Sequence, residues 1–208
     1  RAETVILWGA NVNDLYPPYT RWLKAAREAG TKIIYIDPRR TRTSIWCDRQ
    51  LRPQPGTDGV LALGAIRYVL EKGAYDEERA RFQIEDFENL APQTEKFTLE
   101  HVQAITGLAL EEIVAFYETV ASSRKTIVWI GGSLSRQTNG ITTDRAIILM
   151  QALRDNLIGE GKGMLTFQSG KPGGGEELVD HFFGENNTPK MNFRRLRMAM
   201  EKKNLDIL

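Results

Sequence analysis

The stretch that decides the fold is TKIIYIDPRRTRTSIWCDRQLRPQPGTDGVLAL, residues 31–63. It begins with the apolar run KIIYI, whose lack of polar alternation is typical of a parallel strand covered on both faces. The run ends at the turn DPRR (37–40), and the segment GTD (56–58) then opens an apolar stretch with helical spacing. Ligands of doubly wound sheets bind beyond the strand ends, so this stretch predicts a ligand site as well as a strand and a helix.

The neighbouring segments extend this pattern into an α/β fold. The run TVILW (4–8) predicts a strand that ends on Gly9, and YTRWLKAAREAG (19–30) predicts a helix that stops at Gly30. Strand, helix and strand form a βαβ unit, which is right-handed in nearly all proteins. A third apolar strand, KTIVWIGG (125–132), ends on a glycine pair. We therefore predict an α/β, three-layer αβα, Rossmann-like domain with a mostly parallel sheet.

Helical periodicity fills the segments between and after these strands. Pro92 is expected to end one helix and Thr143 to N-cap another. From Glu160 the chain is rich in glycine, so residues 160–176 are predicted to be an irregular loop, and 189–208 to be a helix that leads toward a truncated strand. The predicted helices cover residues 59–73, 75–92, 98–107, 109–123 and 142–159.

The composition points to no nucleic-acid or membrane partner. The 208 residues include 28 Lys and Arg against 27 Asp and Glu, for a net charge of +1. No apolar run is long enough to span a membrane. The single cysteine, Cys47, cannot form an internal disulfide or hold a metal cluster with several thiolates. A strand that starts almost at the first residue leads us to expect an excised or processed piece of a longer chain.

Polar clusters follow the three predicted strands, at residues 9–11, 37–40 and 131–133. A glycine after the first strand lets backbone N–H groups approach a phosphate, and an acidic residue after the second can accept hydrogen bonds from ribose hydroxyls. Arg39 and Arg40 can pair with phosphate oxygens. This chemistry suits a nucleotide.

The GTD segment has two interpretations. Thr57 or Asp58 can cap the helix that starts there, which is the simpler one for the position taken alone. Alternatively, the carboxylate of Asp58 can accept the two N–H groups on one edge of guanine, which adenine cannot offer together. An ordinary NAD site is disfavoured because GANVND has one glycine where the dinucleotide fingerprint needs three. The P-loop pattern is missing, and GGSLS lacks one glycine of a hydrolase nucleophile elbow.

Together the motifs resemble the dimethyl sulfoxide reductase family of molybdenum and tungsten enzymes. ILWGANV, IIYIDPRRTRTSIWCD, LRPQPGTDGVLALGAIRYVLEKGAYD, ITGLALEEI and IGGSLSRQTNG occur in the order seen in that family. The resemblance covers nearly the whole chain. It implies that residues 1–208 form a single Rossmann-like domain of a large catalytic subunit, which binds one of two molybdopterin guanine dinucleotides.

The resemblance also implies roles for particular residues. The first cluster would lie near the phosphates, Asp37 and Arg39 would meet the ribose and its polar neighbours, and Asp58 would recognise the guanine edge. The loop after the third strand would add further contacts. This hypothesis requires Asp37 and Asp58 to face one groove. The implied cofactor-binding residues are Trp8, Gly9, Asn11, Asp37, Arg39, Gly56, Thr57, Asp58, Gly132, Ser133 and Gln137.

The remaining implications concern the whole enzyme. It would be an oxidoreductase that uses molybdopterin guanine dinucleotide with molybdenum or tungsten for two-electron redox or oxygen-atom transfer, while this segment ligates no metal and is catalytically silent. An iron–sulfur cluster and the metal-ligating residue would precede this region. The partners would be the remaining domains of the same subunit and an iron–sulfur electron-transfer subunit, in a bacterial or archaeal periplasm or cytoplasm. Cys47 stands where relatives carry a small residue, so we interpret it as a buried small hydrophobe.

Two alternatives from other classes remain. One is a nucleotide-binding Rossmann-like module such as the central domain of a thiamine diphosphate enzyme, which also begins with a strand that ends in glycine. That alternative leaves the paired motifs IDPR and PGTD unexplained. The other is a purely structural domain whose polar loops only cap helices.

Overall fold

Five parallel strands form one sheet in the order β3-β2-β1-β4-β5 in the computed structural model, which describes residues 1–167. Each neighbouring pair of strands is parallel and in continuous register. The predicted Rossmann-like α/β architecture is confirmed, and the described sheet is parallel throughout. The strands are β1 (Thr4–Trp8), β2 (Lys32–Ile36), β3 (Arg49–Leu51), β4 (Thr126–Gly131) and β5 (Gly163–Phe167).

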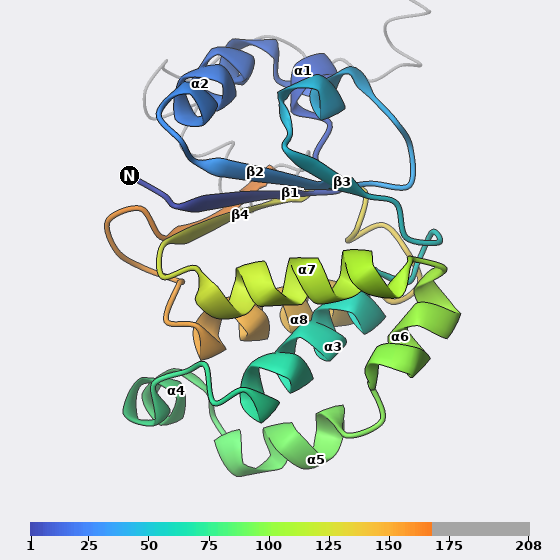
Figure 1. Cartoon of the computed structure of the whole chain (residues 1–208), viewed down its shortest axis with the longest axis vertical. Helices are drawn as coiled ribbons and strands as arrows, with labels where there is room; N and C mark the ends of the chain where they lie inside the picture. Colours follow the sequence, from blue (N-terminus) through green and yellow to red (C-terminus); the bar gives the residue numbers. More distant parts are fainter. Residues whose placement is uncertain (168–208) are drawn as a thin grey trace, which may run out of the picture. The chain divides into compact units, whose positions relative to one another are not determined.

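Helices cover both faces of the sheet, which gives the expected three layers (Figure 1). One face is covered by α1 (Val12–Leu15) and α2 (Pro17–Glu28). The other face is covered by α3 (Asp58–Glu71), α7 (Leu110–Ser122) and α8 (Gly140–Leu153).

Shorter helices complete the described part of the chain. Three shorter helices pack against these helices rather than against the sheet: α4 (Glu77–Gln83) against α8, α5 (Leu90–Thr94) against α3, and α6 (Leu99–Thr106) against α3 and α7. Two short 3₁₀ helices are η1 (Arg42–Trp46) and η2 (Phe87–Asn89). Within residues 1–167, no helix is long and apolar enough to cross a membrane.

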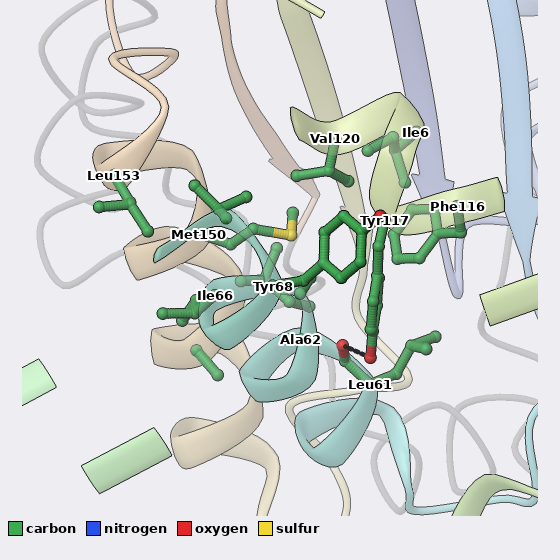
Figure 2. Packing of buried hydrophobic residues seen from close by; sticks show 14 of the residues in the cluster. Ile6, Leu61, Ala62, Ile66, Tyr68, Phe116, Tyr117, Val120, Met150 and Leu153 are labelled. Atoms are coloured by element: carbon green, nitrogen blue, oxygen red, sulfur yellow. Dashed lines mark hydrogen bonds between the residues drawn. The ribbon is translucent and has the colours of Figure 1, made fainter. Parts of the chain in front are cut away.

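Two hydrophobic clusters lie on opposite faces of the sheet. Successive strand side chains point to opposite faces, so Ile6 and Trp8 enter the larger cluster and Leu7 enters the smaller one. Figure 2 shows the larger cluster, where the Tyr117 hydroxyl of α7 donates a 2.9 Å hydrogen bond to the carbonyl oxygen of Leu61 in α3. This bond satisfies a polar atom deep in the core and ties the two helices together.

Several helix boundaries differ from the sequence prediction. The predicted helix over residues 75–92 is divided into α4, η2 and α5, because Asp86 has a left-handed backbone with φ of 59°. Pro92 is the third residue of α5 rather than its end, since the first turn of a helix needs no N–H from that position. The helix α8 already begins at Gly140, so Thr143 lies inside it and is not the N-cap.

The two edge strands were not predicted. The strand β3 has three residues, of which Arg49 and Gln50 are polar, so it lacks an apolar run. The strand β5 lies inside the segment 160–176, and the prediction of an irregular loop is wrong where this segment pairs with β4. The rest of that segment and the predicted helix over 189–208 lie outside the described residues. The single domain over 1–208 stays a prediction.

Candidate functional site

The chain reverses its direction across the sheet between β1 and β4. Strands β2 and β3 lie on one side of β1, and β5 lies beyond β4 on the other, so the loops after β1 and β4 diverge. A Cβ atom on Gly131, at the end of β4, would overlap the backbone carbonyl of Gly9 at the end of β1. The two strand ends are thus too close for any side chain at Gly131. In sheets of this type, ligands bind in the crevice between such diverging loops.

The loop after β4 reaches from β1 to the start of α3. The hydroxyl of Ser133 donates a 3.2 Å hydrogen bond to the carbonyl oxygen of Gly9. The side-chain oxygen of Gln137 lies 3.3 Å from the position that a Cβ atom on Gly56 would occupy. Both side chains are exposed, and Gly132 lies beside them in the chain. The structure therefore places Ser133 next to Gly9, which follows β1, and Gln137 next to Gly56, which precedes α3.

Asp37 follows β2 and is held in one orientation. Its Oδ2 accepts a 2.8 Å hydrogen bond from the Tyr35 hydroxyl, and its Oδ1 accepts one of 2.8 Å from the backbone N–H of Arg39. Burial raises the pKa of Tyr35, so the hydroxyl stays protonated and remains a donor. The Arg39 side chain is 73% exposed, with its Nε 3.9 Å from Oδ1 of Asp37, so it can also meet an anion.

Gln50 holds this acidic turn from the neighbouring strand. Its Nε2 donates to the carbonyl oxygens of Asp37 and Arg39 at 3.2 and 2.8 Å. Gln50 was not predicted as a site residue because it lies on the short strand β3, which has no apolar pattern. The only local signal is that Gln50 precedes the PGTD motif by a few residues, which does not reveal its hydrogen bonds.

Asp58 is the first residue of α3 and its side chain turns toward the end of β1. The residue is 7% exposed, and its Oδ1 accepts a 2.8 Å hydrogen bond from Nε1 of Trp8. Burial raises the pKa of Asp58 above its ordinary value, the hydrogen bond from Trp8 opposes that increase, and the charge of Asp37 adds to it. Asp37 follows β2 and Asp58 is hydrogen-bonded to the last residue of β1, so both carboxylates lie at the carboxyl ends of neighbouring strands.

Thr57 does not cap α3. It occupies the N-cap position, but its side chain makes no capping hydrogen bond, and its hydroxyl donates to the carbonyl oxygen of Gln54 at 2.6 Å. The carboxylate of Asp58 interacts with its own backbone N–H and with Trp8. Capping by Thr57 is thus not what the structure shows, and Asp58 is tied to β1 as well as to its helix.

Two predicted cofactor-lining side chains face the protein interior. Trp8 is 0% exposed, and its ring packs edge to face against Phe116 with centroids 5.9 Å apart. Its side chain therefore does not line the surface of the crevice, and its hydrogen bond to Asp58 links it to the start of α3. The Asn11 side chain accepts from the Thr43 hydroxyl at 2.8 Å and donates to Asp14 at 2.9 Å, which fixes α1 against η1. A contact between Asn11 and a ligand stays a prediction.

Cys47 is half-buried rather than fully buried. It packs against the smaller hydrophobic cluster, and its Sγ donates to the carbonyl oxygen of Thr43 at 3.2 Å. Burial raises the pKa of the thiol to about 12, so the group is protonated at neutral pH. In the part of the chain that the structure describes, no cluster of three or more His, Cys, Asp or Glu could hold a metal ion.

The fold and the crevice define a doubly wound α/β domain of the Rossmann type. Comparison with known proteins then identifies the family. The family described as "Molybdopterin oxidoreductase" matches residues 1–200, so the chain belongs to the molybdopterin oxidoreductase family. The resemblance inferred from the motifs is confirmed, and this membership replaces the alternative of a thiamine diphosphate enzyme domain.

Individual relatives are enzymes of several kinds. F420-dependent formate dehydrogenase 1 subunit alpha from Methanococcus maripaludis is 31% identical over 89% of this chain and 25% of its own length. Assimilatory nitrate reductase catalytic subunit from Bacillus subtilis is 27% identical over 84% of this chain and 25% of its own. The structure of acetylene hydratase from Pelobacter acetylenicus aligns with a TM-score of 0.71 at 28% identity, covering 76% of this chain and 22% of that one. The chain thus spans about a quarter of the length of these formate dehydrogenase and nitrate reductase subunits.

Proposed function

We propose that this chain holds the guanosine part of molybdopterin guanine dinucleotide within a larger molybdenum or tungsten oxidoreductase. The observation that carries the proposal is the pair of buried carboxylates, Asp37 and Asp58, which both lie at the carboxyl edge of the sheet beside the crevice. When bound, the cofactor supplies two-electron redox or oxygen-atom transfer chemistry. The residues of this chain bind and orient its nucleotide end.

The donor and acceptor groups of guanosine fit these residues. An ionised carboxylate offers about four acceptor positions. Asp37 uses two of them on Tyr35 and Arg39, which leaves room for the ribose hydroxyls. Asp58 uses positions on Trp8 and its own N–H, and within residues 1–167 its Oδ2 has no hydrogen bond to another residue. That carboxylate can accept from N1–H and N2–H of guanine.

The surroundings of the carboxylates suit the rest of the nucleotide. Gly56 has φ of +83°, a backbone conformation that favours glycine, and a Cβ atom there would lie only 3.3 Å from the side-chain oxygen of Gln137, so a side chain at this position would crowd the crevice. On the other side, Gly9 and the exposed Ser133 lie at the divergence of the loops, where backbone groups can approach phosphates. The exposed guanidinium of Arg39 can neutralise a phosphate charge.

Binding of nucleotides to the cofactor-free full-length protein tests the proposal. Calorimetric titration should show that GDP binds and that ADP binds much more weakly. Asp58→Ala should weaken GDP binding by about 10- to 150-fold, because a hydrogen bond to a charged group contributes about 1.5–3 kcal/mol. The matched control is Asp76→Ala, which removes an aspartate at the start of the outer helix α4. Undiminished guanine and molybdenum or tungsten content in purified Asp58→Ala protein would contradict the proposal.

The proposal extends to the whole protein. We infer that the remaining domains of the same subunit supply the metal-ligating residue, a second cofactor-binding region and an iron–sulfur cluster, and that an iron–sulfur subunit exchanges electrons with it. Support comes from the share of the relatives that this chain covers, about a quarter of each oxidoreductase. Metal analysis and electron paramagnetic resonance of the reduced full-length protein test this extension. The absence of both metal and iron–sulfur signals would contradict it.

A further inference from the structure

We infer that Trp8 is a specificity-determining residue, because its indole N–H donates to Oδ1 of Asp58 and so keeps the carboxyl group facing the base as an acceptor only. The inference rests on the proposed function, since it concerns how Asp58 distinguishes one base from another. Trp8 acts through Asp58 and touches no ligand itself, because its side chain is fully buried.

The protonation state of Asp58 decides which base it matches. An ionised carboxylate only accepts hydrogen bonds, which fits the adjacent N1–H and N2–H donors of guanine. A protonated carboxyl group offers one donor and one acceptor, which fits N1 and N6–H of adenine instead. Loss of a single proton therefore changes the preferred base at the same position. A site that selects guanine must keep this carboxyl group ionised.

Two features of the site work against ionisation and one works for it. Burial of Asp58 and the nearby charge of Asp37 both raise its pKa, while the hydrogen bond from Trp8 lowers it. Among residues 1–167, Asp37 is the charged group that acts on Asp58 in this way. An indole N–H can donate but never accept, so Trp8 cannot adapt to a protonated partner by reversing the hydrogen bond.

The position of Trp8 makes this donor rigid. It is the last residue of β1, the central strand, where it pairs with Ile36 of β2 and Ile130 of β4. The pairing of β1 with both neighbouring strands therefore sets the position of the indole, and Asp58 orients its carboxylate to meet the N–H. Phe116 adds an edge-to-face packing contact to the ring but makes no hydrogen bond with the indole N–H.

The test removes the donor and keeps an aromatic ring. In the cofactor-free full-length protein, Trp8→Phe should bind GDP about tenfold more weakly near neutral pH. Its GDP affinity should also begin to fall at a higher pH than in the wild type, and its preference for GDP over ADP should shrink on the acid side. Calorimetric titrations with both nucleotides between about pH 5 and pH 8 measure this.

Two further variants separate the hydrogen bond from packing. Phe116→Leu removes the ring that supports Trp8 without removing the donor, so it should lower the melting temperature but leave the pH profile of GDP binding unchanged. Benzothienylalanine at position 8 keeps the size of the ring system and replaces the N–H with sulfur. It should reproduce the altered pH profile even if Trp8→Phe fails to fold.

Asp58→Asn distinguishes failure of this inference from failure of the proposed function. If Asp58→Asn binds GDP as tightly as the wild type, the proposed function is wrong. If Asp58→Asn loses GDP binding while both position 8 variants keep the wild-type pH profile and the wild-type preference over ADP, only the role of Trp8 is wrong. A shifted profile in the position 8 variants, with an unshifted one in Phe116→Leu, supports the inference.

Discussion

Substitution of Gly131 by alanine is a direct test of how closely β1 and β4 approach at the crevice. The added Cβ would overlap the carbonyl carbon and oxygen of Gly9 and press against the backbone nitrogen of Ala10. These are backbone atoms of the adjacent strand, so no side-chain rotation can relieve the overlap. The strand ends must separate, and the loop that carries Ser133 and Gln137 must move with them.

The expected cost follows from this geometry. Overpacking of a core by one methyl group typically costs about 1–3 kcal/mol, and the backbone overlap places Gly131→Ala near about 3 kcal/mol. For a domain of this size, that corresponds to a decrease of about 6–12 °C in melting temperature. Scanning calorimetry of the full-length protein measures the decrease. GDP titration should show weaker binding in the same variant, because the loop is displaced from the crevice.

Gly59→Ala is the control for the change of glycine to alanine itself. Gly59 lies in the first turn of α3, where the nearest neighbour of a Cβ atom would be the rotatable Thr143 side chain at 3.1 Å. Alanine is favoured over glycine in a helix by up to about 1 kcal/mol, so this variant should melt at or slightly above the wild-type temperature. If Gly131→Ala melts like the wild type and binds GDP equally well, the close approach of the two strands is refuted.

Three other predictions concern the core, the site and the cysteine. Tyr117→Phe should lower the free energy of unfolding by about 1 kcal/mol, measured by denaturant titration, because the carbonyl oxygen of Leu61 loses a buried donor. Asp58→Asn should stabilise the cofactor-free protein at neutral pH. The pKa of folded Asp58 is raised, so its ionisation costs stability above that pKa, and melting curves of the variant and wild type should converge as the pH falls below the pKa of an unfolded aspartate. Cys47 should react slowly with iodoacetamide at neutral pH and rapidly after denaturation, as followed by peptide mass spectrometry, because the pKa of its thiol is about 12.

The central strands were predictable from the sequence because each carries its own signal. The apolar β-branched runs of β1, β2 and β4 are bounded by glycine or by the acidic turn, and the structure begins and ends them within a residue of the expected positions. The edge strands carry no such signal. The strand β3 is too short and polar, and β5 lies in a glycine-rich segment that pairs only because β4 provides its neighbour.

The position of a site residue could be predicted where it follows from the order of strands and helices along the chain. It could not be predicted where it depends on how side chains pack. Asp37 follows a strand and Asp58 is the first residue of a helix. The topology therefore places both residues at the same edge of the sheet. The inward direction of Trp8 and the hydrogen bonds of Gln50 depend on which face each side chain takes and on the neighbouring strand. Neither follows from the spacing of residues in the sequence, so Trp8 was expected at the surface of the site.

The most direct test of the central claim is an experimental structure of the full-length protein with its pterin cofactor bound. We predict that the N1 and N2 atoms of guanine lie about 2.7–3.2 Å from the carboxylate oxygens of Asp58, with the ribose hydroxyls at similar distances from Asp37. A guanosine bound away from the crevice between the loops after β1 and β4, with Asp58 in contact with Trp8 alone, would contradict the account.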